Sequence, residues 1–310
     1  MASLVRLASR LPPARRPAAE AIRAVLADGL TRLQANEAGV GSGDVEAVHQ
    51  MRVAVRRLRS DLRTFRPLLQ PHWADELSSA LRPLAASLGA VRDLDVLVAR
   101  FETRGADLAA DLAPLTADLR GLRDMARTAL IESLTSPAHA ALVARVVAAV
   151  REPQIGPLAH GDARDVLPPL VTAAWRRLAR QADPLARALA RDPGAPADTD
   201  LHRARILAKR ARYASEAASQ FMGRRRGRAA ARFARRLANV QQLLGEHQDT
   251  TGLLRELRDG VTNHSADARM AFAAGRLFER EAEAATEVRA AFPGTWAELR
   301  RPRLRRWLDR

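Results

Sequence analysis

The chain has 310 residues, which is enough to bury a sizeable core in one large domain or two medium ones. Lysine and arginine total 51 against 35 aspartates and glutamates, and this net charge of +16 favours a polyanionic partner such as polyphosphate, nucleic acid or an acidic membrane surface. The absence of cysteine excludes disulfides and thiolate chemistry, and no apolar run is long enough to span a bilayer, so we expect a cytoplasmic protein without a membrane partner.

Nearly all of the positive charge is arginine, because Lys209 is the only lysine. Arginine stays charged and its planar group grips phosphate in two places, which favours a phosphate-containing ligand. A GC-rich genome is an alternative explanation, since it enriches alanine, leucine and arginine together.

The first predicted element is a loose leader over residues 1–16. Its short apolar patch is interrupted by arginines and by Pro12 and Pro13, and it lacks the apolar core of a signal peptide. A first helix is expected from Pro17, a natural first-turn proline, to Asn36. Asp44 is then expected to cap the next helix.

The rest of the chain is expected to be helical. Good helix formers dominate, apolar residues recur at spacings of three and four, and sustained alternation is missing. Proline and glycine mark the expected joints: Pro12–Pro13, Gly39–Gly43, Pro67 and Pro71, Gly105, Pro137, Pro153–Pro157, Pro193–Pro196, Gly223–Gly227 and Pro293–Gly294. The fold class is therefore predicted to be all-α.

Two similar copies of a basic motif occur in the chain. His49 is followed by basic residues three, seven, eight and ten positions later, and His202 is followed by basic residues at the same four spacings. About forty residues further on, each copy has a Leu-Gly motif, which begins at Leu88 as LGAVRD and at Leu244 as LGEHQD. Two matches in the same order favour internal duplication. We expect a first half over 17–155 and a second over 156–310.

A helix rotates by 100° per residue, so the basic residues can be placed on its faces. Four arginines share one narrow stripe with His49: Arg52, Arg56, Arg59 and Arg63. Five apolar residues share a different face, which is expected to be buried: Met51, Val55, Leu58, Leu62 and Phe65. The second copy repeats the stripe with His202, Arg205, Lys209 and Arg212, while Arg57 and Arg210 stand at the edge of their stripes.

Like charges stacked along a helix repel one another, and a bound anion or acidic side chains of another helix would offset that repulsion. A solvated charged face is the alternative for one such helix, but two copies in the same phase favour anion binding. The histidines add a charge that titrates near neutral pH, and a neighbouring polyanion favours their protonated form.

Further arginines are candidates for the same ligand. Arg82 and Arg92 occupy the helix of the first Leu-Gly motif, and one or two of Arg232, Arg235 and Arg236 are expected to face the stripe in the second half. Two other basic groups are interpreted as exposed: a turn with Arg224, Arg225, Arg226 and Arg228, and a tail with Arg300, Arg301, Arg303, Arg305 and Arg306.

Catalysis is not expected. Asp93 and Asp95 point about 200° apart on a helix, so they do not share a metal ion easily. Asp93 and Asp249 are interpreted as carboxylates that brace arginines or a helix end. No nucleophile motif, phosphate-binding glycine loop or metal-binding spacing is recognisable, so no cofactor is expected. The four tryptophans are interpreted as core or interhelix anchors: Trp73, Trp175, Trp296 and Trp307. The single Tyr213 does not make a stacking surface for single-stranded nucleic acid.

The histidine motifs and Leu-Gly motifs together resemble the CHAD family, the conserved-histidine α-helical domain. The resemblance runs from about Pro17 to near the C-terminus. It implies two four-helix units related by a pseudo-twofold, a basic central cavity that binds polyphosphate, and association with polyphosphate granules. It also implies two sets of ligand-facing residues: His49, Arg52, Arg56, Arg57, Arg59 and Arg63, and His202, Arg205, Lys209, Arg210 and Arg212.

The second Leu-Gly motif departs from the family pattern at His247-Gln248-Asp249-Thr250. Some family members carry a fused triphosphatase domain, and we expect no such activity in these 310 residues. The expected function is non-catalytic binding of inorganic polyphosphate, as a granule-associated or targeting module. A metal-dependent enzyme acting on polyphosphate or phosphorylated metabolites is the first alternative. An architectural protein that binds nucleic acid is the second, and nonspecific nucleic-acid binding is a possible side activity.

Overall fold

α-Helices account for nearly all of the ordered backbone in this computed structural model, which describes residues 16–195, 197–264 and 267–309. The leader predicted for residues 1–16 lies outside the described residues, apart from Arg16. The first half contains α2 (Ala18–Gly41), α3 (Val45–Thr64), α4 (Pro71–Ala80), α5 (Arg82–Arg104), α6 (Ala113–Leu134) and α7 (Pro137–Arg151). The second contains α8 (Ala163–Arg191), α9 (Asp198–Ser219), α10 (Arg224–Asn263) and α11 (Ala268–Leu299). The all-α prediction is confirmed.

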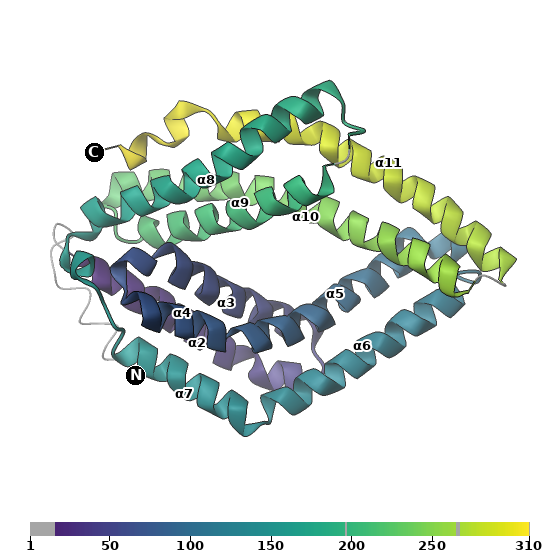
Figure 1. Cartoon of the computed structure of the whole chain (residues 1–310), viewed down its shortest axis with the longest axis horizontal. Coiled ribbons are helices and arrows are strands. Elements are labelled where there is room, and N and C mark those ends of the chain that lie inside the picture. The colour runs from purple at the N-terminus through teal and green to yellow at the C-terminus, as the bar shows by residue number, and fades with distance from the viewer. Residues whose placement is uncertain (1–15, 196, 265–266, 310) are drawn as a thin grey trace.

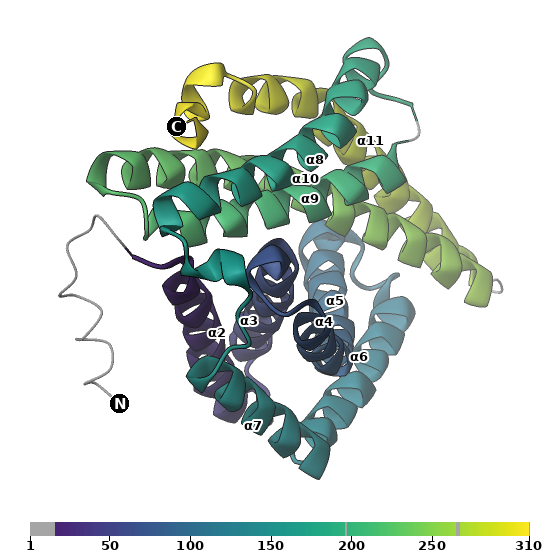
Figure 2. The ribbon, with the colours of Figure 1, turned by 60° about the vertical axis from the view of Figure 1, so that its left-hand side comes forward.

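The helices form two layers, α2 to α7 in one and α8 to α11 in the other (Figure 1). Helices α3 and α5 of the first layer face α9 and α10 of the second, an arrangement that is also clear from the side (Figure 2). Contacts join α3 to α9 and α5 to α10 across the interface. These four helices carry the histidine and Leu-Gly motifs, so the fold brings all four motifs to the same interface.

The short segments that lead into α2 and α8 lie side by side and antiparallel, with Pro17 opposite Asp162. Ala18 N–H donates to the Gly161 carbonyl at 2.9 Å, and Ala163 N–H donates to the Arg16 carbonyl at 2.8 Å. Each half therefore binds the beginning of the other in the same way. This reciprocity is what a pseudo-twofold produces, although the duplication itself stays a prediction.

The first Leu-Gly motif lies in α5, which a break separates from α4, whereas the second lies within the unbroken α10. The break falls at Leu81, two residues before Pro83. Proline has no N–H to donate to the Ser79 carbonyl, so the helical hydrogen bonding is interrupted there. The position equivalent to Pro83 in α10 is Asn239, and α10 continues through it.

One large apolar core runs through both halves and joins residues as distant as Val48 and Leu201. A smaller core lies where the far ends of α5, α6, α10 and α11 pack, around Phe101 and Leu277. The tryptophans belong to the large core as predicted: Trp175, Trp296 and Trp307 are at most 5% exposed, and Trp73 packs against it. The two halves are therefore held together by apolar side chains from both that are buried in one core.

Some predicted joints are wrong. Helix α2 continues through Gly39 to Gly41 instead of ending at Asn36. Helix α11 continues through Pro293 because Phe292 and Trp296, on either side of it, are buried and stack at 6.4 Å, which offsets one lost hydrogen bond.

Among the described residues, no single helix is long and apolar enough to cross a membrane; α6 and α7 reach that threshold only as a pair bent by 62°.

Candidate functional site

Helix α3 presents its basic stripe because its other face is buried. Asp44 caps its first turn, as predicted, by accepting a hydrogen bond from Glu46 N–H at 2.8 Å. The apolar residues predicted to face the core are all at most 3% exposed: Met51, Val55, Leu58, Leu62 and Phe65. The predicted phase of the helix is confirmed, and the stripe is turned away from the core of the first half.

The basic stripes of α3 and α9 meet at the interface between the layers. Six side chains form what we call the central cluster: His49, Arg52 and Arg56 of α3, Arg92 of α5, and Arg205 and Lys209 of α9. Burial, followed by the charges of Arg56, Arg205 and Arg52, lowers the pKa of Lys209 to about 6. Arginines from one half thus act directly on the lysine of the other.

Two aspartates, one from each half, lie against the central cluster. Asp93 Oδ1 is 2.9 Å from Arg52 Nη2, so its predicted role in bracing an arginine is confirmed. Burial raises the pKa of Asp249, and the nearby charge of Arg205 opposes that rise. The four arginines of the cluster therefore face two aspartates, and the cluster keeps an excess of positive charge.

In both halves, the arginine three residues after the histidine of the basic motif lies over the glycine of the Leu-Gly motif. A Cβ atom at Gly89 would be 3.9 Å from Arg52 Nε, and one at Gly245 would be 3.6 Å from Arg205 Nη2. Glycine inside a helix costs about 0.5–1 kcal/mol relative to alanine, and here it leaves each guanidinium group uncovered on that side. The arginine of each histidine motif therefore lies close to the glycine of a Leu-Gly motif.

The two histidines have different surroundings. Burial, followed by the charge of Arg92, lowers the pKa of His49. His202 is exposed and hydrogen-bonded to Gln248, which stands at the position equivalent to Arg92. His202 also lines an outer pocket of about 450 Å³ together with two arginines of α10. His49 therefore belongs to the central cluster, whereas His202 faces this outer pocket.

Arg57 and Arg212 lie in a separate group whose charges are paired inside the protein. Arg57 Nη1 is 3.0 Å and Arg212 Nε is 3.2 Å from the Glu216 carboxylate. Both guanidinium groups lie over the ring of the buried Tyr213, at 5.3 and 4.9 Å from its centroid. We call these residues, together with the buried Asp61 beside Arg57, the closed cluster. The structure thus places these two predicted ligand-facing arginines against an internal carboxylate.

A second group of arginines has no ion-pair partner among the residues that the structure describes. We call it the open row: Arg59, Arg63 and Arg82 of the first half, and Arg177 and Arg210 of the second. Burial, followed by the charges of Arg63 and Arg82, lowers the pKa of Arg59. Burial, followed by Arg63 and Arg177, lowers the pKa of Arg210. Among the described residues, the charges that act on Arg59 and Arg210 are therefore all positive.

Arg177 was missed by the sequence analysis. It lies on α8, outside both repeated motifs, and reaches the open row only because α8 packs against α9. No local pattern distinguishes it from its neighbour Arg176.

Arg232, Arg235 and Arg236 lie on the exposed face of α10, since Phe233 and Leu237 take its buried face. They line a pocket of about 640 Å³ with Arg303 of the C-terminal segment. The expectation that one or two of them face the stripe is corrected accordingly: they form a separate cationic region.

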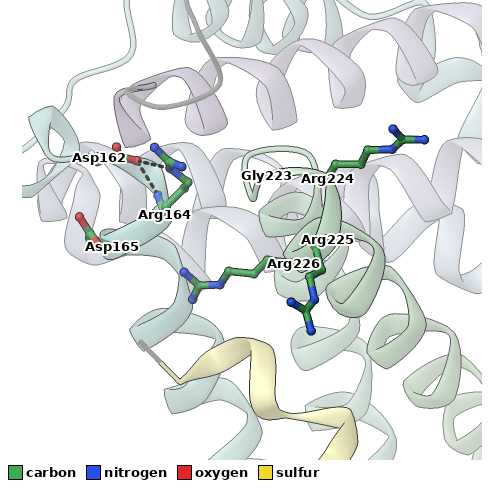
Figure 3. A pocket seen from close by; sticks show the side chains of 7 residues that line it. All are labelled: Asp162, Arg164, Asp165, Gly223, Arg224, Arg225 and Arg226. Atoms are coloured by element: carbon green, nitrogen blue, oxygen red, sulfur yellow. Dashed lines mark hydrogen bonds and ion pairs between the residues drawn. The ribbon is translucent and has the colours of Figure 1, made fainter.

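The first turn of α10 contains Arg224, Arg225 and Arg226, which the sequence analysis placed in an exposed turn. They border a pocket whose other wall carries Asp162 and Asp165, so charges of both signs meet there (Figure 3).

Asp95, the other candidate for acid–base or metal chemistry, is buried and 3.0 Å from Arg127 Nη2. Within the described ranges, no group of three or more histidines and carboxylates is arranged to hold a metal ion.

The comparisons with known proteins match most of the chain. The family model described as the CHAD domain matches residues 24–258. Two uncharacterised proteins of Mycobacterium tuberculosis, from strains CDC 1551 and H37Rv, are each 28% identical over 290 residues, which make up 90% of this chain and 53% of theirs. The chain therefore spans about half the length of these curated relatives.

Two solved structures are similar over nearly the whole chain. The crystal structure of the CHAD domain from the plant Ricinus communis is 29% identical, has a TM-score of 0.70, and covers 92% of this chain and 93% of that chain. PptA from Streptomyces chartreusis is 22% identical, has a TM-score of 0.74, and covers 91% of this chain and 100% of that chain, which is a likeness of fold.

Proposed function

The chain belongs to the CHAD domain family, and from this premise we propose that it binds inorganic polyphosphate through the central cluster and the open row. The observation that carries the proposal is that basic residues of α3 and α9 lie close together at a shared interface, where the charges of α3 help to lower the pKa of Arg205 and Lys209 in α9. Like charges held together in this way destabilise the free protein. A polyanion that binds between them stabilises the folded state by mass action.

The shape of the basic surface suits a linear polymer better than a single phosphate. From His49 to Arg63, the basic stripe of α3 extends for about 21 Å, since each helical residue rises about 1.5 Å. Arginine donates to phosphate oxygens as a two-pronged group, and successive arginines along the stripe would contact successive phosphates. Arg205 and Lys209 would contact the same polymer from the opposite layer.

A binding role is proposed in preference to a catalytic one. Asp93 is paired with Arg52 and Asp95 with Arg127, so both carboxylates already have a partner inside the protein. The proposed module requires no cofactor and acts in the cytoplasm, where it would attach to polyphosphate granules. Nucleic acid is proposed as a weaker, nonspecific competitor for the same charges.

The proposal is tested by titrating the purified chain with polyphosphate of defined length, and with single-stranded DNA and RNA of equal charge, at physiological salt. Polyphosphate is expected to bind more tightly than either nucleic acid, and its affinity should fall as salt rises, because binding releases counterions. Equal affinity for all three polymers would contradict specific polyphosphate binding.

A further inference from the structure

The outer face of α10 carries a cationic pocket that the proposed function does not use. The pocket has a volume of about 640 Å³, within the range of about 300–1,000 Å³ that is typical of small-ligand sites. Its lining consists of Arg232, Arg235, Arg236, Asn239, Arg303 and Leu304. Every charged residue in this lining is an arginine, so the pocket is suited to an anion.

Most of these arginines have no carboxylate to neutralise them. Arg236 Nη1 is 3.1 Å from Glu298 Oε2. Arg232, Arg235 and Arg303 have no ion-pair partner among the described residues. Residues three and four positions apart share a helix face, with Cβ atoms about 5–6 Å apart, so neighbouring guanidinium groups can reach the same oxyanion.

Contacts on both sides of Arg303 hold the backbone of the C-terminal segment beside α10. Trp307 is 4% exposed and its ring lies 6.3 Å from that of Phe233 in α10. Arg226 Nη2 donates to the Trp307 carbonyl at 2.8 Å, and Leu304 packs against the core. The backbone positions that carry the arginines are therefore set before a ligand binds, which reduces the entropy lost on binding.

The neighbouring pocket at the start of α10 provides a contrast within the same helix. It also has arginines, but Asp162 and Asp165 lie opposite them (Figure 3). Its Arg226 is already engaged by main-chain carbonyls of the C-terminal segment. The pocket with Arg303 differs because its lining includes no carboxylate.

We propose that Arg232, Arg235 and Arg303 form a second anion site that binds the phosphoryl groups of inorganic phosphates independently of the central cluster. Two arginines one turn apart on α10 and a third from the C-terminal segment donate to one tetrahedral oxyanion. Asn239 adds a neutral side-chain amide, and Leu304 closes the pocket on its apolar side. Free orthophosphate and short condensed phosphates share this chemistry.

Arginine footprinting tests the site residue by residue. The full chain is treated with phenylglyoxal in orthophosphate or tripolyphosphate, with chloride at the same ionic strength as reference, and modification is read by mass spectrometry. Modification of Arg232, Arg235 and Arg303 is expected to slow, whereas modification of the exposed Arg187 and Arg269 is not. Protection by both anions assigns the site to single phosphates, and protection by tripolyphosphate alone assigns it to condensed ones. Equal slowing at all five arginines would overturn the proposal, and so would an unchanged rate at Arg232, Arg235 and Arg303 with both anions.

Paired variants separate this site from the central cluster. In Arg232→Gln/Arg303→Gln, loss of two donors should weaken protection of Arg235 at least about a hundredfold, since each hydrogen bond to a charged group contributes at least about tenfold. The matched control is Arg228→Gln/Arg301→Gln, which removes two exposed charges from the same helix and segment but outside the pocket. Arg52→Glu/Arg205→Glu should leave protection of Arg235 intact. Loss of protection in either of these last two variants would overturn the independent site.

Discussion

The closed cluster and the open row lie at equivalent places on the two sides of the interface between the halves. Only in the closed cluster does a carboxylate neutralise the arginines. Arg57 and Arg210 each stand eight residues after the histidine of their own motif. Each lies near the residue fourteen positions after the histidine of the other motif: Glu216, at 3.0 Å, for Arg57, and Arg63 for Arg210. The same contact across the interface is an ion pair on one side and a repulsive pair on the other.

A single difference in charge therefore decides which side of the central cluster favours an anion. Two like charges roughly 6 Å apart repel by about 3 kcal/mol at an effective dielectric constant of about 20. A phosphate that enters the open row relieves that repulsion, whereas one that enters the closed cluster must displace Glu216. We expect the polymer to leave the central cluster on the side of Arg63 and Arg210.

Among single substitutions, the largest effect on binding is expected from making the two sides alike. Arg63→Glu would give Arg210 the partner that Arg57 has in Glu216, so two arginines of the open row would be lost to the ligand. Affinity for polyphosphate should fall about a hundredfold, since each lost contact contributes about 1.5 kcal/mol. Isothermal titration calorimetry measures the change. Arg187→Glu alters the net charge equally on an exposed surface, and an equal loss in that control would contradict the comparison.

Next in size is the response of the central cluster to pH. Because the pKa of Lys209 is lowered to about 6, the lysine is mostly neutral above that pH in the free protein, and a bound anion would favour its charged form. Affinity should rise about tenfold between pH 8 and pH 6.5, since uptake of one proton changes affinity by at most about tenfold per pH unit, and should level off below pH 6. Lys209→Arg, which stays charged, should flatten this profile. An unchanged slope in that variant would assign the response to another group.

A smaller effect, of opposite sign, is expected from opening the closed cluster. Glu216→Gln removes the carboxylate that holds Arg57 and Arg212, so both arginines become available to a phosphate. Affinity should rise about threefold, because the freed side chains also lose the order that the ion pair imposed on them. Calorimetry at the same salt concentration detects this gain. Unchanged or weaker binding would show that Glu216 is not what keeps Arg57 and Arg212 from binding phosphate.

The smallest effect on binding is expected from Asp61, where stability should change instead. Burial raises the pKa of Asp61 from 3.8 to about 7, so the folded chain keeps this proton at a pH where the unfolded chain has released it. Asp61 therefore lowers the free energy of unfolding progressively as pH rises from about 4 to 7.

Asp61→Asn should consequently stabilise the protein at pH 8, by up to about 4 kcal/mol from three pKa units, and change little near pH 4. Urea unfolding at both pH values is the measurement. A stability difference that is the same at both would contradict the buried titration, and polyphosphate affinity should match that of the wild type.

The sequence predicted those features that follow from periodicity along one helix. The spacing of Met51, Val55 and Leu58 determined which face of α3 is buried, and the opposite stripe then carried His49 and Arg52. The recurrence of the Leu-Gly motif favoured internal duplication, and in the structure each of its glycines lies close to an arginine of a histidine motif: Gly89 to Arg52, and Gly245 to Arg205.

The remaining features depend on which helices pack against one another, and local sequence patterns do not encode that packing. Glu216 pairs with Arg57 across 159 residues of sequence, and Arg177 joins the open row from a helix without any motif. Arg232 and Arg235 were expected to face the basic stripe because they precede the second Leu-Gly motif. The burial of Phe233 instead places them on the exposed face of α10.

The central claim is tested most directly by calorimetric titration of Arg52→Glu/Arg205→Glu with polyphosphate, beside Arg187→Glu/Arg269→Glu, which changes the net charge by the same amount at exposed positions. The account predicts a loss of affinity of at least about a hundredfold in the first variant and only a small loss in the second. Equal losses in the two variants, with both folded, would contradict it and would assign binding to net charge alone.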